Sequence, residues 1–246
     1  MPEQKSVKQR LDLILVEREL AASRTQAQAL IMAGQVSAGG RILDKPGQTF
    51  DSYIDLHLKR QAPYVSRAGE KLASVASRLG LVFEGLIVLD VGSSTGGFTD
   101  YALQNGAARS YCVDVGTGQL SYKLRQDPRV VVMEQTDIRV AALPEPADIA
   151  VIDVSFISLT KVLMAVSALV KPGAPIVAML KPQFEAGKPL ADKHRGVIPM
   201  GDERDEVIED VREWIREHFD IKIECDSDVH GAEGNVERFM LLGTRS

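Results

Sequence analysis

The sequence is poor in cysteine, and its two cysteines are not arranged as metal ligands or disulfide partners. Cys112 and Cys225 lie far apart in a chain of 246 residues and show no metal-type spacing. A disulfide framework or a zinc site is therefore not expected, and the reducing cytoplasm is the expected location. The sequence therefore predicts no metal site.

Long hydrophobic runs are also missing. The longest predominantly apolar stretch, Val162–Val170, has nine residues, whereas a helix needs roughly 20 to cross a bilayer. The N-terminal residues, MPEQKSVKQR, are polar and lack the apolar core of a signal peptide. We therefore expect no membrane-spanning helix and no membrane partner.

Positive charges are outnumbered by negative charges in the whole chain, and they are unevenly distributed. The net charge of −5 argues weakly against a nucleic-acid partner. Residues 1–78, however, contain 12 Lys and Arg against 8 Asp and Glu, whereas residues 79–246 contain 17 against 26. This asymmetry predicts an N-terminal part that contacts phosphates and an acidic body that does not, although a mixed surface can produce it by chance. The candidate RNA contacts are Arg10, Arg24, Arg41, Lys45 and Arg67.

The N-terminal part shows the pattern of two short helices. Apolar residues at helical spacing predict the first over residues 10–19. The second is expected to begin at Ser23, with Gln26 completing a capping box. It is expected to end at Gly34, a residue suited to the left-handed position after a helix.

A short β segment follows the two helices. Gly39-Gly40 predicts a hairpin turn, and Thr49–Leu58 has the composition of a strand. Gln61-Ala62-Pro63 predicts a linker, because proline disfavours helix at the residue before it. The predicted domains are a small α+β module at residues 1–62 and a larger domain at residues 63–246.

The larger domain alternates buried strands with helices, which predicts a doubly wound, mostly parallel, Rossmann-like sheet. Strands are expected at Leu86–Val91, Ser110–Val115, Val130–Met133, Asp148–Val154, Pro175–Leu180, Ile221–Asp226 and Glu237–Leu242. Helices are expected at Gly69–Leu79, Gly97–Asn105, Leu159–Leu169 and Glu203–His218. The last two strands lie too close together for a helical crossover, so they should form an antiparallel pair at the edge.

The strongest local signal is LIVLDVGSSTGGFTD at residues 86–100. A buried strand leads through Asp90 to Gly92, Gly96 and Gly97, and a helix follows. Glycines let the backbone approach a ligand, and a helix N-terminus offers free N–H groups. The spacing differs from the dinucleotide motif G-x-G-x-x-G, so NAD is the weaker hypothesis. An ordinary strand–turn–helix is the alternative.

Two aspartates extend this pattern along the carboxyl edge of the sheet. Asp114 ends the second strand, where Rossmann-type folds place a carboxylate on ribose hydroxyls. Asp137 follows the third strand and could accept a hydrogen bond from an adenine amine. Each alone could be a loop or capping residue, but with the glycine loop they predict an adenosine-shaped pocket.

Four alternating charges are expected to converge at the same edge. Asp153 and Lys181 each end an apolar strand, and Glu237 begins the antiparallel strand. Lys71 lies in the first turn of the helix that precedes the first strand. A lysine after an apolar strand is unfavourable unless it is paired or functional. A structural salt-bridge cluster is the alternative to a catalytic group.

Several of these segments resemble one family of enzymes. VSRAGEKL, DVGSSTGGFTD, DVGTGQL, VIDVSFISL, LKPQFE and GNVE are similar to motifs of the TlyA-type (hemolysin A) ribosomal RNA 2′-O-methyltransferases, relatives of the FtsJ-like RNA methyltransferases. The N-terminal segment resembles the S4 RNA-binding domain of that family. The resemblance covers nearly the whole chain. It implies a class I methyltransferase fold joined to a small S4-type domain.

The resemblance also implies functional residues and a reaction. It implies a Lys–Asp–Lys–Glu tetrad at Lys71, Asp153, Lys181 and Glu237, with Lys181 as general base. It further implies contacts with S-adenosylmethionine by Gly96, Phe98, Asp114 and Asp137. The strand–glycine–helix pattern itself adds Asp90, Gly92 and Gly97 as candidate cofactor-binding residues. The implied partners are ribosomal RNA or ribosomal subunits, modified at cytidines. The chain departs from the family in the loop EAGKPLADKHRGVIPMGD, which lacks an expected basic, glycine-rich run.

Three rival hypotheses remain open. A base methyltransferase of the same fold would need an amino-methylating Asn/Asp-Pro-Pro-aromatic tetrapeptide, but this chain has Asp153-Val154-Ser155-Phe156, and neither Cys112 nor Cys225 is placed as a nucleophile for carbon methylation. A cytolysin would need a membrane-active segment, which is not evident. A non-catalytic RNA-binding assembly factor would not need Lys181 and Asp114.

Overall fold

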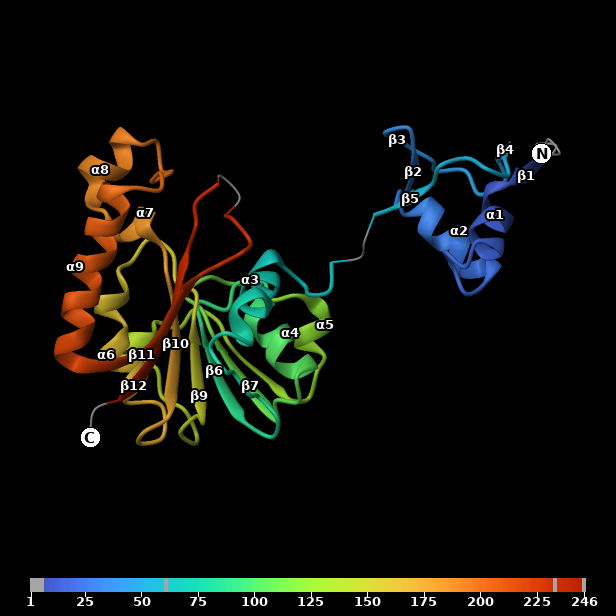
Figure 1. Ribbon diagram of the computed structural model, residues 1–246. Helices are drawn as coiled ribbons and strands as arrows, with labels where there is room; N and C mark the ends of the chain where they lie inside the picture. The colour runs from blue at the N-terminus through green and yellow to red at the C-terminus, as the bar shows by residue number, and fades with distance from the viewer. Residues whose placement is uncertain (1–6, 60–61, 232–233, 245–246) are drawn as a thin grey trace. The chain divides into compact units, whose positions relative to one another are not determined.

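The computed structural model describes residues 7–59, 62–231 and 234–244 and divides the chain into two compact units, Met1–Gln61 and Ala62–Ser246 (Figure 1). The division falls at the predicted linker, of which Gln61 lies outside the described residues. Within the described ranges, no helix is long and apolar enough to cross a membrane.

The described part of the N-terminal unit, residues 7–59, contains two helices and five short strands. The helices are α1 (Leu11–Glu17) and α2 (Arg24–Met32). The strands are β1 (Lys8–Arg10), β2 (Val36–Ala38), β3 (Arg41–Ile42), β4 (Thr49–Asp51) and β5 (His57–Leu58). Both strands of the predicted hairpin, β2 and β3, pair antiparallel across Gly39 and Gly40, which have positive φ angles. The apolar faces of both helices meet in a small core with Val36.

The predicted ends of the second helix are confirmed. Ser23 precedes α2, and its Oγ accepts a hydrogen bond from the Gln26 N–H at 3.2 Å. The Gln26 Oε1 accepts in return from the Ala22 N–H at 2.8 Å. Gly34 follows the helix with φ of 66°, the left-handed conformation that glycine adopts without a steric penalty.

The prediction of one strand over Thr49–Leu58 is wrong. Strand β4 pairs with β1, whereas β5 pairs with β2 in a different sheet. The Asp51 Oδ1 accepts from the Tyr53 N–H at 2.8 Å, which closes a side-chain turn directly after β4. The chain therefore turns where its composition alone indicates continued extension.

The C-terminal unit is built on a seven-stranded sheet with the order β11-β12-β10-β9-β6-β7-β8. The strands are β6 (Ile87–Val91), β7 (Arg109–Val113), β8 (Val130–Met133), β9 (Ile149–Ile152), β10 (Pro175–Leu180), β11 (Phe219–Asp226) and β12 (Arg238–Thr244). Five are parallel, and β12 is antiparallel to both β10 and β11. Only β11 of the last pair lies at the edge, because β12 is inserted between β10 and β11; the prediction of two edge strands is corrected in this respect.

Helices cover both faces of this sheet (Figure 1). One face packs against α3 (Arg67–Ala76), α4 (Gly97–Gln104) and α5 (Tyr122–Arg125). The other packs against α6 (Leu163–Ser167) and α9 (Asp202–His218). Alternate residues of the central strands enter the two cores: Val88 packs on the first side and Leu89 on the second. This confirms the doubly wound fold.

Several short helices complete the connections at the carboxyl edge. The predicted helix Leu159–Leu169 is two elements, η2 (Leu159–Lys161) and α6, separated by Val162. Three further helices were not expected: α5, α7 (Pro182–Glu185) and α8 (Gly187–Lys193). A 3-10 turn, η1 (Ile138–Val140), follows β8.

Candidate active site

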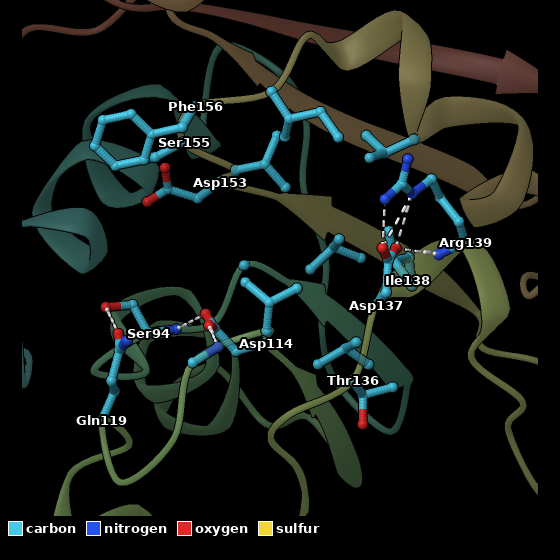
Figure 2. A pocket seen from close by; sticks show the side chains of 18 residues that line it. Ser94, Asp114, Gln119, Thr136, Asp137, Ile138, Arg139, Asp153, Ser155 and Phe156 are labelled. Carbon is cyan, nitrogen blue, oxygen red and sulfur yellow. Dashed lines mark hydrogen bonds and ion pairs between the residues drawn. The ribbon is translucent and has the colours of Figure 1, made fainter.

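A cavity of about 510 Å³ lies where β6, β7 and β9 end. Its lining combines branched apolar side chains with a few polar groups, as in typical small-molecule sites. Figure 2 shows Asp153 and Phe156 on one side of the space, Ser94 and Asp114 on another, and Asp137 with Arg139 on a third. A cavity therefore lies at the carboxyl edge of the sheet, where the sequence predicts an adenosine-shaped pocket.

Gly92 begins the loop under this cavity. Its φ is 78°, and a Cβ atom there would lie 2.6 Å from the main-chain oxygen of Asp153. Any side chain would therefore displace the loop after β9. The close approach seen here is between two loops of the site, and the approach of Gly92 to a ligand stays a prediction.

The remaining members of the glycine motif have packing roles. A Cβ at Gly97 would lie 2.7 Å from the Gly69 nitrogen, so this glycine lets α4 approach α3. Gly96 has φ of 96° and faces Leu124. The Phe98 side chain is buried 6.0 Å from the Phe239 ring, measured between centroids. None of these three residues lines the cavity, and their contact with a cofactor stays a prediction.

Asp90 is buried beneath the loop and does not line the cavity. Its Oδ2 accepts from the Thr99 N–H at 3.0 Å and from the Thr99 Oγ1–H at 2.7 Å. Burial raises the pKa of Asp90 to about 7, while the Thr99 hydrogen bonds act in the opposite direction. Asp90 thus fixes the first turn of α4. Its contact with a cofactor stays a prediction, because Asp90 is not among the residues that line the cavity.

Asp114 follows β7 and lines the cavity. Its Oδ2 accepts from the Ser94 N–H at 2.8 Å, and its Oδ1 accepts from the Gly116 N–H at 2.7 Å. The carboxylate therefore connects the loop after β6 to the loop after β7. Each oxygen has further lone-pair capacity for a hydroxyl group of a ligand.

Asp137 also lines the cavity, but its carboxylate is bound to a neighbour. Arg139 donates through Nε at 3.0 Å to Oδ1 and through Nη2 at 2.5 Å to Oδ2, as drawn in Figure 2. These hydrogen bonds lower the pKa of Asp137 to about 2. A contact with an adenine amine would have to share oxygens already engaged by Arg139.

The four predicted charges form two ion pairs. The Lys71 Nζ lies 2.6 Å from the Glu237 Oε1, and both side chains are buried. The Lys181 Nζ lies 2.6 Å from the Asp153 Oδ1. One Glu237 oxygen, Oε2, is buried without a hydrogen-bond partner in the described part of the chain.

Strand register places these pairs at one edge. Leu180 of β10 pairs with Arg238 of β12, so Lys181 and Glu237 each lie one residue beyond that pair on the same side. Strand β9 is parallel to β10 and ends one residue before Asp153. Helix α3, which contains Lys71, packs at its start against the glycine loop. The predicted convergence is therefore consistent with the topology.

Sequence reasoning missed two residues beside Lys181. The Lys181 Nζ donates a hydrogen bond to the Ser155 Oγ at 2.8 Å. Phe156 lines the cavity with 90% of its surface exposed and φ of 63°, a strained conformation for a bulky residue. Its ring lies 4.8 Å from that of Phe184, measured between centroids. Nothing in the spacing of VIDVSF distinguishes these side chains from ordinary loop residues.

The candidate RNA contacts are distributed over both units. Arg10, Arg24, Arg41 and Lys45 belong to the N-terminal unit, and Arg41 and Lys45 are exposed. Arg10 and Arg24 are bound to the carboxylate of Asp12. Arg67 begins α3 in the C-terminal unit, where its guanidinium donates to the main-chain oxygen of His230.

The chain is similar over most of its length to known proteins. The FtsJ-like methyltransferase family matches residues 64–244, and the S4 domain matches residues 9–52. YqxC of Bacillus subtilis is 44% identical, over 96% of this chain and 86% of that protein. The 16S/23S rRNA (cytidine-2′-O)-methyltransferase TlyA of Mycobacterium tuberculosis is 38% identical, over 96% and 90%. A solved structure from Streptococcus thermophilus is 39% identical with a TM-score of 0.72, over 98% and 90%.

The two family matches agree with the two structural units in fold and in residue range. The methyltransferase match spans the doubly wound unit with its cavity, and the S4 match lies within the small N-terminal unit. A match of 181 residues exceeds half of the chain. The chain therefore belongs to the FtsJ-like methyltransferase family and carries an N-terminal S4 domain.

Proposed function

We propose that this protein transfers a methyl group from S-adenosylmethionine to the 2′-hydroxyl of a cytidine in ribosomal RNA. The observation that carries the proposal is the pair of lysine–carboxylate contacts, Lys71–Glu237 and Lys181–Asp153, at the carboxyl edge of the sheet, where Asp153 lines the cavity. The TlyA relative, whose name gives that reaction, supports the substrate. Residues 1–62 would bind the RNA, and residues 63–246 would carry out the chemistry.

The cavity suits S-adenosylmethionine in size and in the nature of its lining. Its volume of about 510 Å³ lies in the range of small-molecule sites. Val115, Ile138 and Val162 offer apolar surface for a flat base, and Asp114 offers carboxylate oxygens for ribose hydroxyls. When bound, the cofactor supplies an electrophilic methyl group on a sulfonium.

The charged residues would prepare the hydroxyl for attack. A ribose hydroxyl is a poor nucleophile until its proton is removed or polarised, and a lysine can accept that proton in its neutral form. Asp153 and Ser155 both hold the Lys181 Nζ, which limits the directions in which it can point. Lys181 would accept the hydroxyl proton, and the bound cofactor would supply the methyl group. Most of the rate would come from holding these atoms in line.

The Lys71–Glu237 pair would orient the same region. Both side chains are buried, so each charge depends on the other for compensation. Lys71 would present a fixed positive charge beside the hydroxyl, which favours the developing negative charge on oxygen. A purely structural ion cluster would not require a cavity beside it, and this distinction can be tested.

The test uses an RNA substrate with one 2′-deoxy sugar at the modified cytidine. We expect it to bind with little loss, because phosphates dominate the interface, but to accept no methyl group, because the reacting atom is missing. Incorporation from labelled cofactor is measured for this RNA and for its all-ribose counterpart. Equal labelling would show that a base atom is the acceptor and would exclude the ribose proposal.

A variant of the enzyme serves as control. Lys181→Ala should abolish transfer to the all-ribose RNA while the affinity for S-adenosylmethionine, measured by calorimetry, changes by less than about tenfold. Near-normal turnover of this variant would leave the lysine–carboxylate pairs as a structural cluster.

A further inference from the structure

The N-terminal unit contains a buried carboxylate that the chemistry of the site does not use. Asp12, in the first turn of α1, is 0% exposed. Its Oδ1 accepts from the Arg10 Nε at 3.0 Å, and its Oδ2 accepts from the Arg10 Nη2 at 2.9 Å. The same Oδ2 accepts from the Arg24 Nε at 3.0 Å and from the Gln28 Nε2 at 2.9 Å. One carboxylate thus joins a strand and two helices.

Hydrogen bonds stabilise the ionised form of Asp12. The Arg10 hydrogen bond is the largest of several that hold the pKa of Asp12 well below its usual range. The carboxylate is therefore ionised under all ordinary conditions. Because two guanidinium groups share it, the cluster of Asp12, Arg10 and Arg24 has a net charge of +1.

Both arginines keep hydrogen-bond donors that Asp12 does not engage. The side chains of Arg10 and Arg24 remain 42% and 54% exposed, although Asp12 itself is fully buried. Arg24 is held through Nε, and no hydrogen bond or ion pair of its two Nη atoms is found in the described part of the chain. Arg10 donates to Asp12 through Nε and Nη2, and no hydrogen bond of its Nη1 is found among the described residues. These are the donors that bind phosphate oxygens in a fork geometry.

Fixing an arginine before it meets its ligand favours binding. A free arginine side chain has considerable rotamer entropy, part of which is lost when it binds a phosphate. Asp12 imposes this order during folding, so less entropy is lost on binding. The same contact keeps the two positive charges near each other despite their repulsion.

We propose that Asp12 is a positioning residue that holds Arg10 and Arg24 as a paired receptor for one backbone phosphate of RNA. This inference rests on the proposed function, because it takes RNA as the ligand of the N-terminal unit. By this inference Asp12 increases RNA affinity through the two arginines, although its own negative charge repels a phosphate.

The test is whether removing the charge of Asp12 weakens or strengthens RNA binding. Asp12→Asn removes a negative charge, so simple electrostatics predicts tighter RNA binding, whereas positioning predicts binding weaker by on the order of tenfold, the scale of one charge-assisted hydrogen bond. Asp44→Asn is the matched control, because Asp44 is an exposed acid of the same unit. Affinity of the full-length chain for transcribed ribosomal RNA is measured by filter binding. We expect the control to bind as well as wild type or tighter.

A second background separates positioning from general stability. In a chain carrying Arg10→Ala and Arg24→Ala, adding Asp12→Asn should cause no further weakening, because the side chains through which Asp12 acts are gone. Equal weakening in both backgrounds would overturn the inference, as would an Asp12→Asn variant that binds like wild type. A wild-type chain that fails to bind ribosomal RNA would overturn the proposed function as well.

Loss of folding is controlled by thermal unfolding of each variant. If Asp12→Asn unfolds the N-terminal unit at the assay temperature, Gln28→Met replaces it, because it removes one donor to Asp12 and no charge. This variant should weaken binding to a smaller extent. Unchanged affinity of folded Gln28→Met would then overturn the inference.

Discussion

Asp90 shows how burial changes the chemistry of a single carboxyl group. It lies at the sheet end of the glycine loop, where its Oδ2 accepts two hydrogen bonds from Thr99. Its Oδ1 is buried without a hydrogen-bond partner among the described residues. Because burial disfavours the charged form, the pKa of Asp90 rises to about 7 from a model-compound value of 3.8.

This raised pKa couples stability to pH. Between about pH 4 and pH 7 the folded chain holds a proton on Asp90 that the unfolded chain has lost, so the free energy of unfolding falls as pH rises across that window. The contribution of Asp90 to this fall is on the order of 4 kcal/mol. Asp90→Asn has no titration there, so its stability should fall less. Urea unfolding at several pH values checks this, and parallel profiles for the two proteins would contradict it.

Single residues of the site differ in how far sequence could predict them. Gly92, Asp114, Asp153 and Lys181 were predictable because each follows an apolar strand, and parallel strands end at one edge. Asp137 was placed correctly, but its pairing with Arg139 depends on a local turn that spacing does not encode.

The contact between Ser155 and Lys181 was not predictable for a related reason. It requires the loop after β9 to turn through Phe156 at a positive φ, and that conformation has no signal in the residue types. The glycine motif shows the opposite limit. Its pattern indicated a ligand loop, yet Gly97 serves the close contact of α3 and α4.

At the scale of elements, two short helices hold the site together. Helix α7 begins directly after Lys181 and ends at Glu185, and η2 begins at Leu159. The Glu185 Oε1 accepts from the Leu159 N–H at 2.8 Å. Glu185 is half-buried, and this burial raises the pKa of its carboxyl group. The loop with Ser155 is thereby tied to the helix that follows Lys181.

Removing this tie should loosen both loops. We expect Glu185→Ala to slow methyl transfer at least about tenfold, because small displacements of reacting groups have large effects on rate. The cofactor affinity should change much less, since Glu185 does not line the cavity. Glu185→Gln keeps an oxygen acceptor for Leu159 and should restore most of the rate. Single-turnover kinetics measures the step, and equal loss in both variants would indicate a role for the charge instead.

Element prediction succeeded where apolar periodicity is strong. Strands β8 and β10 agree with the sequence in both bounds, because a short apolar run ends at polar or turn residues in each case. Helix α7 was missed because four residues are too few to show a helical period, although Pro182 suits a first helical position. Strand β12 was expected at an edge because pairing order is not encoded within one strand.

At the scale of the whole molecule, charge separates the two units. The unit of residues 1–61 contains nine Lys and Arg against seven Asp and Glu, and the unit of residues 62–246 contains 20 against 27. Half of the surplus of four positive charges over residues 1–78 therefore belongs to the N-terminal unit, and residues 62–78 supply the other half. A surplus of two positive charges is small, so RNA affinity must depend on where the cations lie, as in the cluster around Asp12.

The division of labour between the units gives a prediction for a truncated chain. A fragment of residues 59–246 retains all residues that line the cavity, together with both lysine–carboxylate pairs. It lacks the cluster of Asp12, Arg10 and Arg24. We therefore expect it to bind S-adenosylmethionine with an affinity within a few-fold of the intact chain, and to bind RNA much more weakly.

Salt dependence shows whether that loss comes from phosphate contacts. Each contact that disappears should reduce the slope of log affinity against log salt by roughly 0.7–0.9, because fewer counterions are released from the RNA. Calorimetry with the cofactor and filter binding of RNA over a range of salt concentrations measure the two effects separately. A fragment with unchanged slope would show that the acidic unit binds the phosphates. A fragment that folds but binds no cofactor would show that the cavity needs residues 1–58, although none of them lines it.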